Sequence, residues 1–249
     1  MSGLDFATII QQIYKERNNG VVRGFGVIKA NPEKSKHLET ATINMEDQWI
    51  DFVNLRKEEY AHDSRVPVIE FGTPFEDASR RDLTINSLFY NINENKVEDF
   101  TQKGIMDMKN GLIRTPLEPL KTFLDDPLRV MRVFRFAARF NFTLDPSIMP
   151  AIHNTQVLDS LQHKVSKERI GKELEPALEH ENSVKFLNYL HEAGLLSVIF
   201  SVTDKTTDSI TSQQIQDMFV FNSKIWNKIM HSAQEMQSVL LEVNKSHIE

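Results

Sequence analysis

The chain has 249 residues and 40% of them are hydrophobic, which is enough for one large domain or two small ones with a real core. It has no cysteine, which excludes disulfides and cysteine metal sites, and its formal net charge of −6 does not indicate a broad nucleic-acid-binding surface, although a local group of arginines can still bind phosphate. No apolar run approaches the length of a membrane span and the N-terminus lacks signal-peptide character, so we expect a soluble intracellular protein that does not contact a membrane.

The first part of the chain predicts one helix followed by strands. Residues 1–17 read as an amphipathic helix because apolar side chains recur at helical spacing, namely Leu4, Phe6, Ile9, Ile10 and Tyr14. Residues 21–28 look like a strand, and residues 37–45 and 48–55 look like two paired strands. Residues 57–68 read as a charged loop. This part therefore predicts a helix and a small sheet.

Asp51 interrupts an otherwise apolar strand, in which its neighbours are Ile50, Phe52 and Val53. An acidic side chain rarely lies in such a run without a partner or a purpose. One interpretation is that Asp51 points outward or caps a neighbouring backbone group. The other is that it belongs to a functional site, and the strand alone favours neither.

Residues 73–90 predict a helix that starts at Thr73, which precedes a proline. On such a helix Asp82 and Asn86 share a face, with Arg81 beside them. This face can present a carboxylate, an amide and a guanidinium to a polar ligand. The same residues also fit a surface helix with polar pairs at a spacing of four, and that alternative stays open.

Residues 97–115 predict a short strand followed by a short helix and another strand. Gly104 and Gly111 bracket the helix, and Asp107 lies at its centre. Such an arrangement is typical of a structural connection with glycine stops. Prolines at positions 116 and 119 mark a junction, after which the chain reads as one helix after another.

The segment from Leu124 to Phe142 predicts a helix with a clear start, because Asp126 is a candidate N-cap and Pro127 suits the first turn. Four arginines fall on one stripe of this helix: Arg129, Arg132, Arg135 and Arg139. The other side is apolar: Val130, Val133, Phe134, Ala137 and Phe140. We therefore expect the helix to pack by one side and to offer arginines from the other. Alternatively, Asp126 is only a cap and Arg129 belongs to a solvated face.

Four further helices are predicted in the C-terminal half, and Asp145 and Pro146 start the first of them. Ser166 is the candidate N-cap of the second, which carries apolar residues at helical spacing as far as Leu178. Residues 182–193 form the third, which Gly194 ends. Residues 203–211 read as a polar linker, and residues 215–243 read as a helix without side chains that indicate chemistry.

Five strings in a fixed order carry a resemblance to a known family. They are K-A-N-P-E-K-S-K-H-L-E-T-A-T, D-F-V-N-L-R, F-G-T-P-F-E-D-A-S-R-R-D-L-T-I-N-S-L-F-Y, D-D-P-L-R-V-M-R-V-F-R-F-A and S-K-E-R-I-G-K-E-L. From Gly24 to Phe200 the chain resembles the eukaryotic CCA-adding enzymes, which are class II tRNA nucleotidyltransferases with a poly(A)-polymerase-type head. One such string means little, but the ordered set is specific.

The resemblance implies an α+β fold. A partial polymerase-beta-type nucleotidyltransferase head would span residues 1–117, followed by an all-helical neck over residues 118–180. An incomplete helical body would span residues 181–249. In the neck, the string that starts at Ser166 resembles the element that buttresses the nucleotide-reading helix.

The resemblance also implies roles for individual residues. The segment with Arg80, Arg81, Asp82 and Asn86 would contact the sugar and phosphates of the incoming nucleotide. Asp126 and Arg129 would pair with the base, and Arg132 and Arg135 extend this nucleotide-binding stripe. Residues Asp99, Gly104 and Asp107 match the family's hinge element, although its usual glycine spacing is only approximate here. Asp51 falls where the superfamily can carry a third acidic residue beside the catalytic metals.

The implied reaction is the addition of CMP and AMP, from CTP and ATP with Mg²⁺, to the 3′ end of immature tRNA. It fits a mitochondrial, a nuclear or a cytosolic location equally. A carboxylate can accept a hydrogen bond from the exocyclic amino group that cytosine and adenine share, and a guanidinium can donate to a ring nitrogen or carbonyl. Uracil and guanine present other edges, which leaves polar groups unpaired.

Two catalytic elements of the family have no counterpart here. No G-G-x-V-R-D loop is present, Val22-Arg23-Gly24 lacks its glycine pair, and no D-x-D pair occurs near the first predicted strand. In the family these hold two metal ions. The metal ligands of this chain thus stay unassigned, and we expect a chain truncated at both ends and inactive alone. One alternative is a non-catalytic paralogue that binds tRNA or nucleotide. Another is a poly(A)-polymerase-type enzyme for other RNA, which the strings H-L-E-T-A-T and D-F-V-N-L-R oppose.

Overall fold

The computed structural model describes residues 3–17, 24–28, 40–59 and 68–199, together with residues 231, 232 and 235. The predicted linker at 203–211 lies outside the described residues, as does almost all of the predicted helix at 215–243. The chain divides into two compact units, residues 1–81 and residues 82–249. Strands and short helices come first and longer helices follow, so the fold is α+β, as the sequence predicts. The predicted domain limits at residues 117 and 180 stay predictions.

Unit 1 begins with helix α1 (Gly3–Arg17) and an antiparallel sheet in the order β1-β2-β3. The strands are β1 (Gly24–Ile28), β2 (Thr40–Met45) and β3 (Gln48–Phe52). The turn between β2 and β3 consists of Glu46 and Asp47, both with positive φ, as tight hairpin turns require. The predicted helix and strands are therefore confirmed in the described residues, except that the strand predicted over residues 48–55 ends at Phe52.

The core between α1 and β2 is small. It contains Ala7, Ala41 and Ile43, all fully buried. The predicted apolar side of α1 is wrong in part, because Phe6 and Ile9 are 44% and 46% exposed. Leu4 and Ile10 pack against this core as predicted, together with the buried Gly3 and Ala7.

Unit 1 continues with a second antiparallel pair, β4 (Arg56–Glu59) and β5 (Val68–Phe71). Residues 57–68 are therefore not simply a loop, because both ends of this range belong to strands. The strands pair Lys57 with Glu70, whose side chains form an ion pair at 2.7 Å across the ladder, so this charge of the predicted loop is part of a strand pair. Helix α2 (Pro74–Ser79) follows, and Thr73 and Glu76 form a capping box at its start.

Unit 2 opens with short elements. They are the 3₁₀ helix η2 (Thr84–Asn86), the hairpin of β6 (Phe89–Asn91) and β7 (Lys96–Glu98), helix α3 (Gly104–Asn110) and strand β8 (Leu112–Ile113). Strand β8 pairs in parallel with β9 (Thr143–Leu144), which follows the fifth helix. This pair ties the opening of unit 2 to its helical part.

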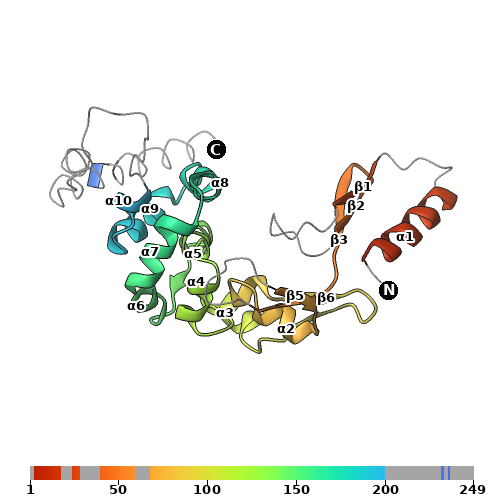
Figure 1. Cartoon of the computed structure of the whole chain (residues 1–249), viewed down its shortest axis with the longest axis horizontal. Helices are drawn as coiled ribbons and strands as arrows, with labels where there is room; N and C mark the ends of the chain where they lie inside the picture. The colour runs from red at the N-terminus through yellow and green to blue at the C-terminus, as the bar shows by residue number, and fades with distance from the viewer. Residues whose placement is uncertain are drawn as a thin grey trace, which may run out of the picture. The chain divides into compact units, whose positions relative to one another are not determined.

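In the described residues of unit 2, as far as residue 199, seven more helices follow and lie together in the green-to-blue part of Figure 1. They are α4 (Pro119–Asp125), α5 (Arg129–Arg139), α6 (Ile148–Ile152), α7 (Thr155–Lys164), α8 (Lys167–Leu178), α9 (Ser183–Glu192) and α10 (Leu196–Ile199). Helix α5 packs against both α8 and α9. Its buried side confirms Val130, Val133, Phe134 and Ala137, and Phe134 stacks on Tyr189 of α9 with ring centroids 5.3 Å apart. The predicted cap at Ser166 and the stop at Gly194 are also confirmed.

Among the described residues, no helix is both long enough and apolar enough to cross a membrane.

Candidate functional site

The segment with the two adjacent arginines does not continue the preceding helix. Helix α2 ends at Ser79, and Leu83 has extended backbone angles. The predicted single helix over residues 73–90 is therefore wrong. The Asp82 carboxylate accepts the Leu83 N–H at 2.9 Å, and the Thr84 N–H donates to the Arg114 carbonyl at 2.9 Å. Both N–H groups are thus unavailable to a helix, which explains why the chain turns here.

At the end of unit 1, Asp77 organises the arginine pair. Its buried carboxylate accepts hydrogen bonds from Arg80 at 2.9 Å, from Arg81 at 2.9 and 3.0 Å, and from the Arg56 N–H at 3.0 Å. Arg80 also binds Glu58 at 2.9 Å. Burial raises the pKa of Asp77, but the hydrogen bonds from Arg80, the Arg56 N–H and Arg81 outweigh it, so the pKa lies below its ordinary value. Both arginines are therefore held in fixed positions by carboxylates of their own unit.

In unit 2, Asp82 is also almost fully enclosed, with 7% of its surface exposed. Its Oδ1 accepts from the Leu83 N–H and from the Asn86 amide at 3.3 Å, and its Oδ2 accepts from Nε of Arg132 at 2.7 Å. Asp82 and Asn86 are close together, as predicted, although a turn and η2 bring them together instead of one helix. Burial lowers the pKa of Arg132, but Asp82 and Glu173 raise it more, so the pKa lies above its ordinary value.

Asp126 and Arg129 lie where α4 ends and α5 begins. The predicted N-cap is wrong by two residues, because Leu128 holds that position and has no side-chain cap bond. Asp126 still shapes this start, since its Oδ1 accepts the Leu128 N–H at 3.2 Å and its carbonyl accepts the Arg129 N–H at 3.0 Å. Its carboxylate also binds Arg169 of α8, at 3.0 Å from Oδ2 and 3.4 Å from Oδ1.

The expected open stripe of arginines on α5 is wrong for three of its members. Arg129 is buried at 9% exposure, and its Nη1 donates to the Thr122 carbonyl at 3.4 Å. Arg132 is bound by Asp82 and Glu173, and Arg135 donates to Glu173 at 2.6 Å. Arg139 is exposed. Helix spacing placed these arginines on one stripe, but α8 packs against α5 and brings Glu173 to it, and the turn before η2 brings Asp82.

The predicted hinge residues hold the start of α3. The Asp99 carboxylate accepts hydrogen bonds from the Ile105 N–H at 3.0 Å and from Thr101, and these outweigh the effect of burial, so its pKa is lowered. A Cβ on Gly104 would lie 2.5 Å from the Thr84 carbonyl oxygen, so only glycine fits this close approach. Asp107 is buried and accepts from the Thr84 hydroxyl at 2.7 Å.

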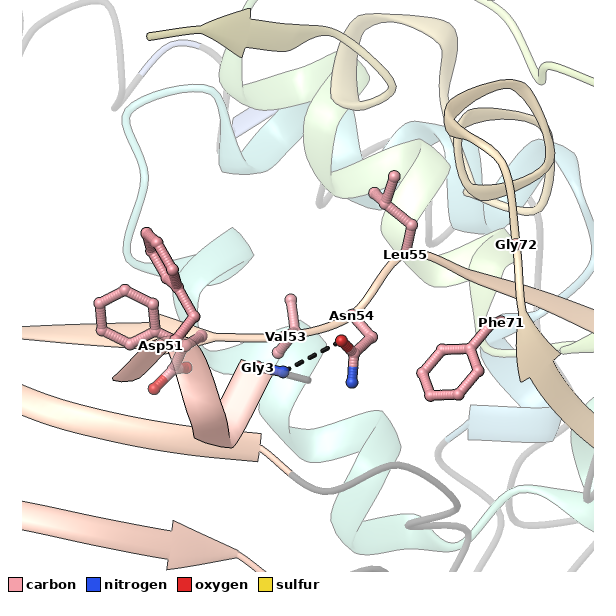
Figure 2. Close-up of a pocket in the computed structure, with 9 residues that line it drawn as sticks. Gly3, Asp51, Val53, Asn54, Leu55, Phe71 and Gly72 are labelled. Carbon is pink, nitrogen blue, oxygen red and sulfur yellow. Dashed lines mark hydrogen bonds between the residues drawn. The ribbon is translucent and has the colours of Figure 1, made fainter. Parts of the chain in front are cut away.

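Asp51 lies exposed on β3, at a cavity of about 550 Å³ in unit 1. Figure 2 shows it on the opposite side of the view from Phe71, with Asn54 between them. The Asn54 side-chain oxygen already accepts the Gly3 N–H at 3.0 Å. Within the described part of the chain, no group of three or more histidine or acidic side chains could hold a metal ion. The described residues therefore do not fit a site for two metal ions.

Comparison with known proteins shows the family. The family model described as "Poly A polymerase head domain" matches residues 2–114. A second family model, described as "Probable RNA and SrmB- binding site of polymerase A", matches residues 141–206. The mitochondrial CCA tRNA nucleotidyltransferase of Saccharomyces cerevisiae is 44% identical over 97% of this chain. The chain belongs to the class II tRNA nucleotidyltransferases. It spans 46% of the length of that relative, so about half of it.

Two more distant matches complete the comparison. A poly(A) polymerase I of Salmonella typhi is 28% identical over 67% of this chain and 39% of its own length. A solved structure, the Bacillus stearothermophilus CCA-adding enzyme in complex with CTP, is 27% identical and superposes with a TM-score of 0.56. That match covers 64% of this class II nucleotidyltransferase chain and 38% of the solved one. The sequence identity to the Saccharomyces cerevisiae nucleotidyltransferase, 44%, is thus clearly higher than the 28% identity to the poly(A) polymerase.

Sequence reasoning missed the two carboxylates that organise the arginines, Asp77 and Glu173. Glu173 lies on the buried face of α8 with Ile170 and Ala177, and a carboxylate in an apolar stripe signals a buried partner. Asp77 precedes Arg80 by three residues, a spacing that brings side chains together on a helix. Both signals were present in the sequence.

Proposed function

We propose that this chain is the nucleotide-selecting part of a CCA tRNA nucleotidyltransferase, which adds CMP and AMP to the 3′ end of immature tRNA. The observation that carries the proposal is the start of α5, where Asp126 and Arg129 lie in the string D-D-P-L-R within a fold shared with the CCA-adding enzymes. Asp126 is held there by Arg169. The similarity to a relative named as mitochondrial makes the mitochondrion the compartment that we propose.

The chemistry of these two side chains fits the selection of CTP and ATP. A carboxylate offers about four lone-pair positions, and Asp126 uses part of them on the Leu128 N–H and on Arg169. A remaining position can accept from the amino group that cytosine and adenine share. Arg129 can donate to the ring edge. With uracil or guanine a donor or acceptor stays unpaired, which costs about 1–3 kcal/mol for each buried group.

The sugar would be recognised close by. Asp82 and Asn86 lie in the same unit as the start of α5, and Arg132 connects Asp82 directly to this helix. The sugar and phosphate contacts of Arg80 and Arg81, and the hinge role of Asp99, Gly104 and Asp107, stay predictions from the family resemblance.

Mg²⁺ is proposed only as the ion that accompanies CTP and ATP. The described residues contain no group of three side chains able to hold it, so no residue of this chain is assigned to it and no reaction step is derived through it. A non-catalytic paralogue that binds nucleotide without transferring it is the second candidate. It is favoured because the described residues contain no group of three side chains able to hold the metal ion that transfer needs.

Two measurements on the purified chain test the proposal. The first is equilibrium binding of CTP, ATP, UTP and GTP in the presence of Mg²⁺. We expect CTP and ATP to bind at least tenfold more tightly than UTP and GTP. That ratio corresponds to about 1.4 kcal/mol, the size of one unpaired buried group. Equal binding of all four nucleotides, or none, would contradict the proposal.

The second measurement is incorporation of CMP and AMP into tRNA that lacks its 3′ CCA, beside an active relative as the control. Incorporation would assign the complete reaction to this chain. Selective binding without incorporation would assign nucleotide selection alone and would support the non-catalytic candidate. Addition of several AMP residues in succession to an RNA other than tRNA would instead indicate an activity of the poly(A) polymerase type.

A further inference from the structure

Four charged side chains in unit 2 form a connected group, which we call the α5 charge cluster: Asp82, Arg132, Glu173 and Arg135. Nε of Arg132 donates to Asp82 at 2.7 Å, and its Nη1 lies 3.5 Å from Glu173. Glu173 also accepts from Nε of Arg135 at 2.6 Å. The cluster thus joins three parts of the unit, namely the turn before η2, helix α5 and helix α8.

The α5 charge cluster is closed and electrically balanced. Its two carboxylates and two guanidinium groups sum to zero, so the cluster does not attract a triphosphate as an unpaired arginine group does. The side chains of Asp82, Glu173 and Arg135 are only 7%, 11% and 13% exposed. Removing one partner leaves an uncompensated charge in this enclosed place, which is strongly unfavourable. The geometry therefore favours fixing positions over binding phosphate.

Among the contacts of the described residues, Arg132 is the one member of the cluster that joins two different elements to α5. It pairs with Asp82 in the turn before η2 and with Glu173 on α8. It follows Arg129 on α5 by three residues, so the two share one turn of the helix. On its other side it holds Asp82, whose Oδ1 accepts from Asn86. A single guanidinium thus connects the segment expected to contact the sugar with the turn expected to read the base.

We propose that Arg132 is a positioning residue that couples sugar recognition to base recognition through its pair with Asp82. This inference rests on the proposed function, because it concerns the same nucleotide. With the Asp82–Arg132 pair intact, a displacement of the segment before η2 moves the turn of α5 that carries Arg129. With the pair broken, the two recognition events become independent.

The experiment compares nucleotide binding by Asp82→Asn, Arg132→Gln and the double variant with the unaltered chain. Dissociation constants are measured for CTP, dCTP and UTP with Mg²⁺. The ratio of dCTP to CTP reports sugar discrimination, and the ratio of UTP to CTP reports base discrimination. We expect each single variant to lower both ratios by about fivefold or more, the usual lower range of coupling between sites. The double variant should be no worse than either single one, because both break the same pair.

Three controls make the result decisive. Arg132→Lys keeps the charge but has one ammonium in place of the planar fork, so we expect only partial recovery. Glu168→Gln removes another carboxylate of α8, which is 76% exposed and pairs with Lys172. Because an exposed ion pair contributes little, this variant should change neither ratio. Circular dichroism and thermal unfolding identify variants that fail to fold. If Arg132→Gln fails in this way, Arg132→Met replaces it, because it also removes the guanidinium that pairs with Asp82.

Each outcome has one meaning. If Asp82→Asn lowers only sugar discrimination, the Asp82–Arg132 pair does not couple the sugar to the base and the inference is wrong. Additive effects in the double variant contradict it equally. If the unaltered chain binds CTP and no variant changes either ratio, the inference fails while the proposed function stands. If the unaltered chain binds no CTP, both fail together.

Discussion

The two units of this chain differ in how much apolar surface their described residues bury. Unit 2 contains one cluster of 24 buried apolar residues, whereas the cluster between α1 and β2 in unit 1 contains three. In unit 1, Trp49 and Phe71 are 63% and 71% exposed. Burial of apolar surface is the main favourable term in folding, so unit 2 has the larger source of stability. Unit 1 depends more on polar interactions, such as the capping box of α2 and the Asp77 group.

The largest expected effect is in the core of unit 2. Phe134 is fully buried and stacks on Tyr189. Phe134→Ala should lower the free energy of unfolding by about 3–5 kcal/mol, because it removes a large side chain and leaves a cavity. Urea unfolding measures the change. The matched control is Phe140→Ala at the C-terminal end of the same helix. The Phe140 ring is 44% exposed, so its loss should lower the free energy of unfolding by about 1 kcal/mol or less. Equal losses would mean that the core assignment of α5 is wrong.

The same test in the core of unit 1 should give a smaller and more local effect. Ile43→Ala removes the largest side chain of a three-residue cluster and should cost about 2 kcal/mol, the low end for this substitution. Hydrogen exchange locates the change, and we expect faster exchange in β2 and β3 with unchanged protection in α5. An equal loss of protection in α5 would show that the two units unfold as one.

Capping gives the next effect in size. The Thr73 hydroxyl accepts the Glu76 N–H, and the Glu76 carboxylate accepts the Thr73 N–H at 2.7 Å. Thr73→Ala should cost about 1 kcal/mol, whereas Thr73→Ser should retain most of the stability because serine caps equally well. The midpoint of urea unfolding of unit 1 measures both. A loss of equal size in both variants would contradict a capping role.

The smallest effect concerns pH. Burial raises the pKa of Asp77, but hydrogen bonds from Arg80, the Arg56 N–H and Arg81 lower it more, so the folded pKa lies below the unfolded one. The resulting stability is fully present above the unfolded pKa of about 3.9. It is lost as pH falls through the folded pKa. Urea midpoints of unit 1 should therefore fall with acidification, and Asp77→Asn should flatten that dependence. An unchanged slope in Asp77→Asn would assign the effect to other carboxylates.

Much of the local structure was predictable from the sequence because it depends on near neighbours. The hairpin at Glu46 and Asp47, the glycine stop after α9 and the cap at Ser166 follow from side chains within a few residues. The buried side of α5 follows from spacing along one helix. The helix predicted over residues 73–90 failed because Asp82 binds the next backbone N–H and Thr84 binds the Arg114 carbonyl, and helical spacing contains neither contact.

The candidate site divides in the same way. The sequence by itself determined the family, the α+β order, and the identity of the polar residues at the start of α5. Only the tertiary structure decided which charges meet: Asp82 with Arg132, fifty residues apart, and Asp126 with Arg169, forty-three apart. Local spacing fixes the face on which a side chain lies. Its partner across a helix interface depends on how separate elements pack, and that packing brought two of the four expected open arginines, Arg132 and Arg135, into a charge-balanced cluster with Asp82 and Glu173.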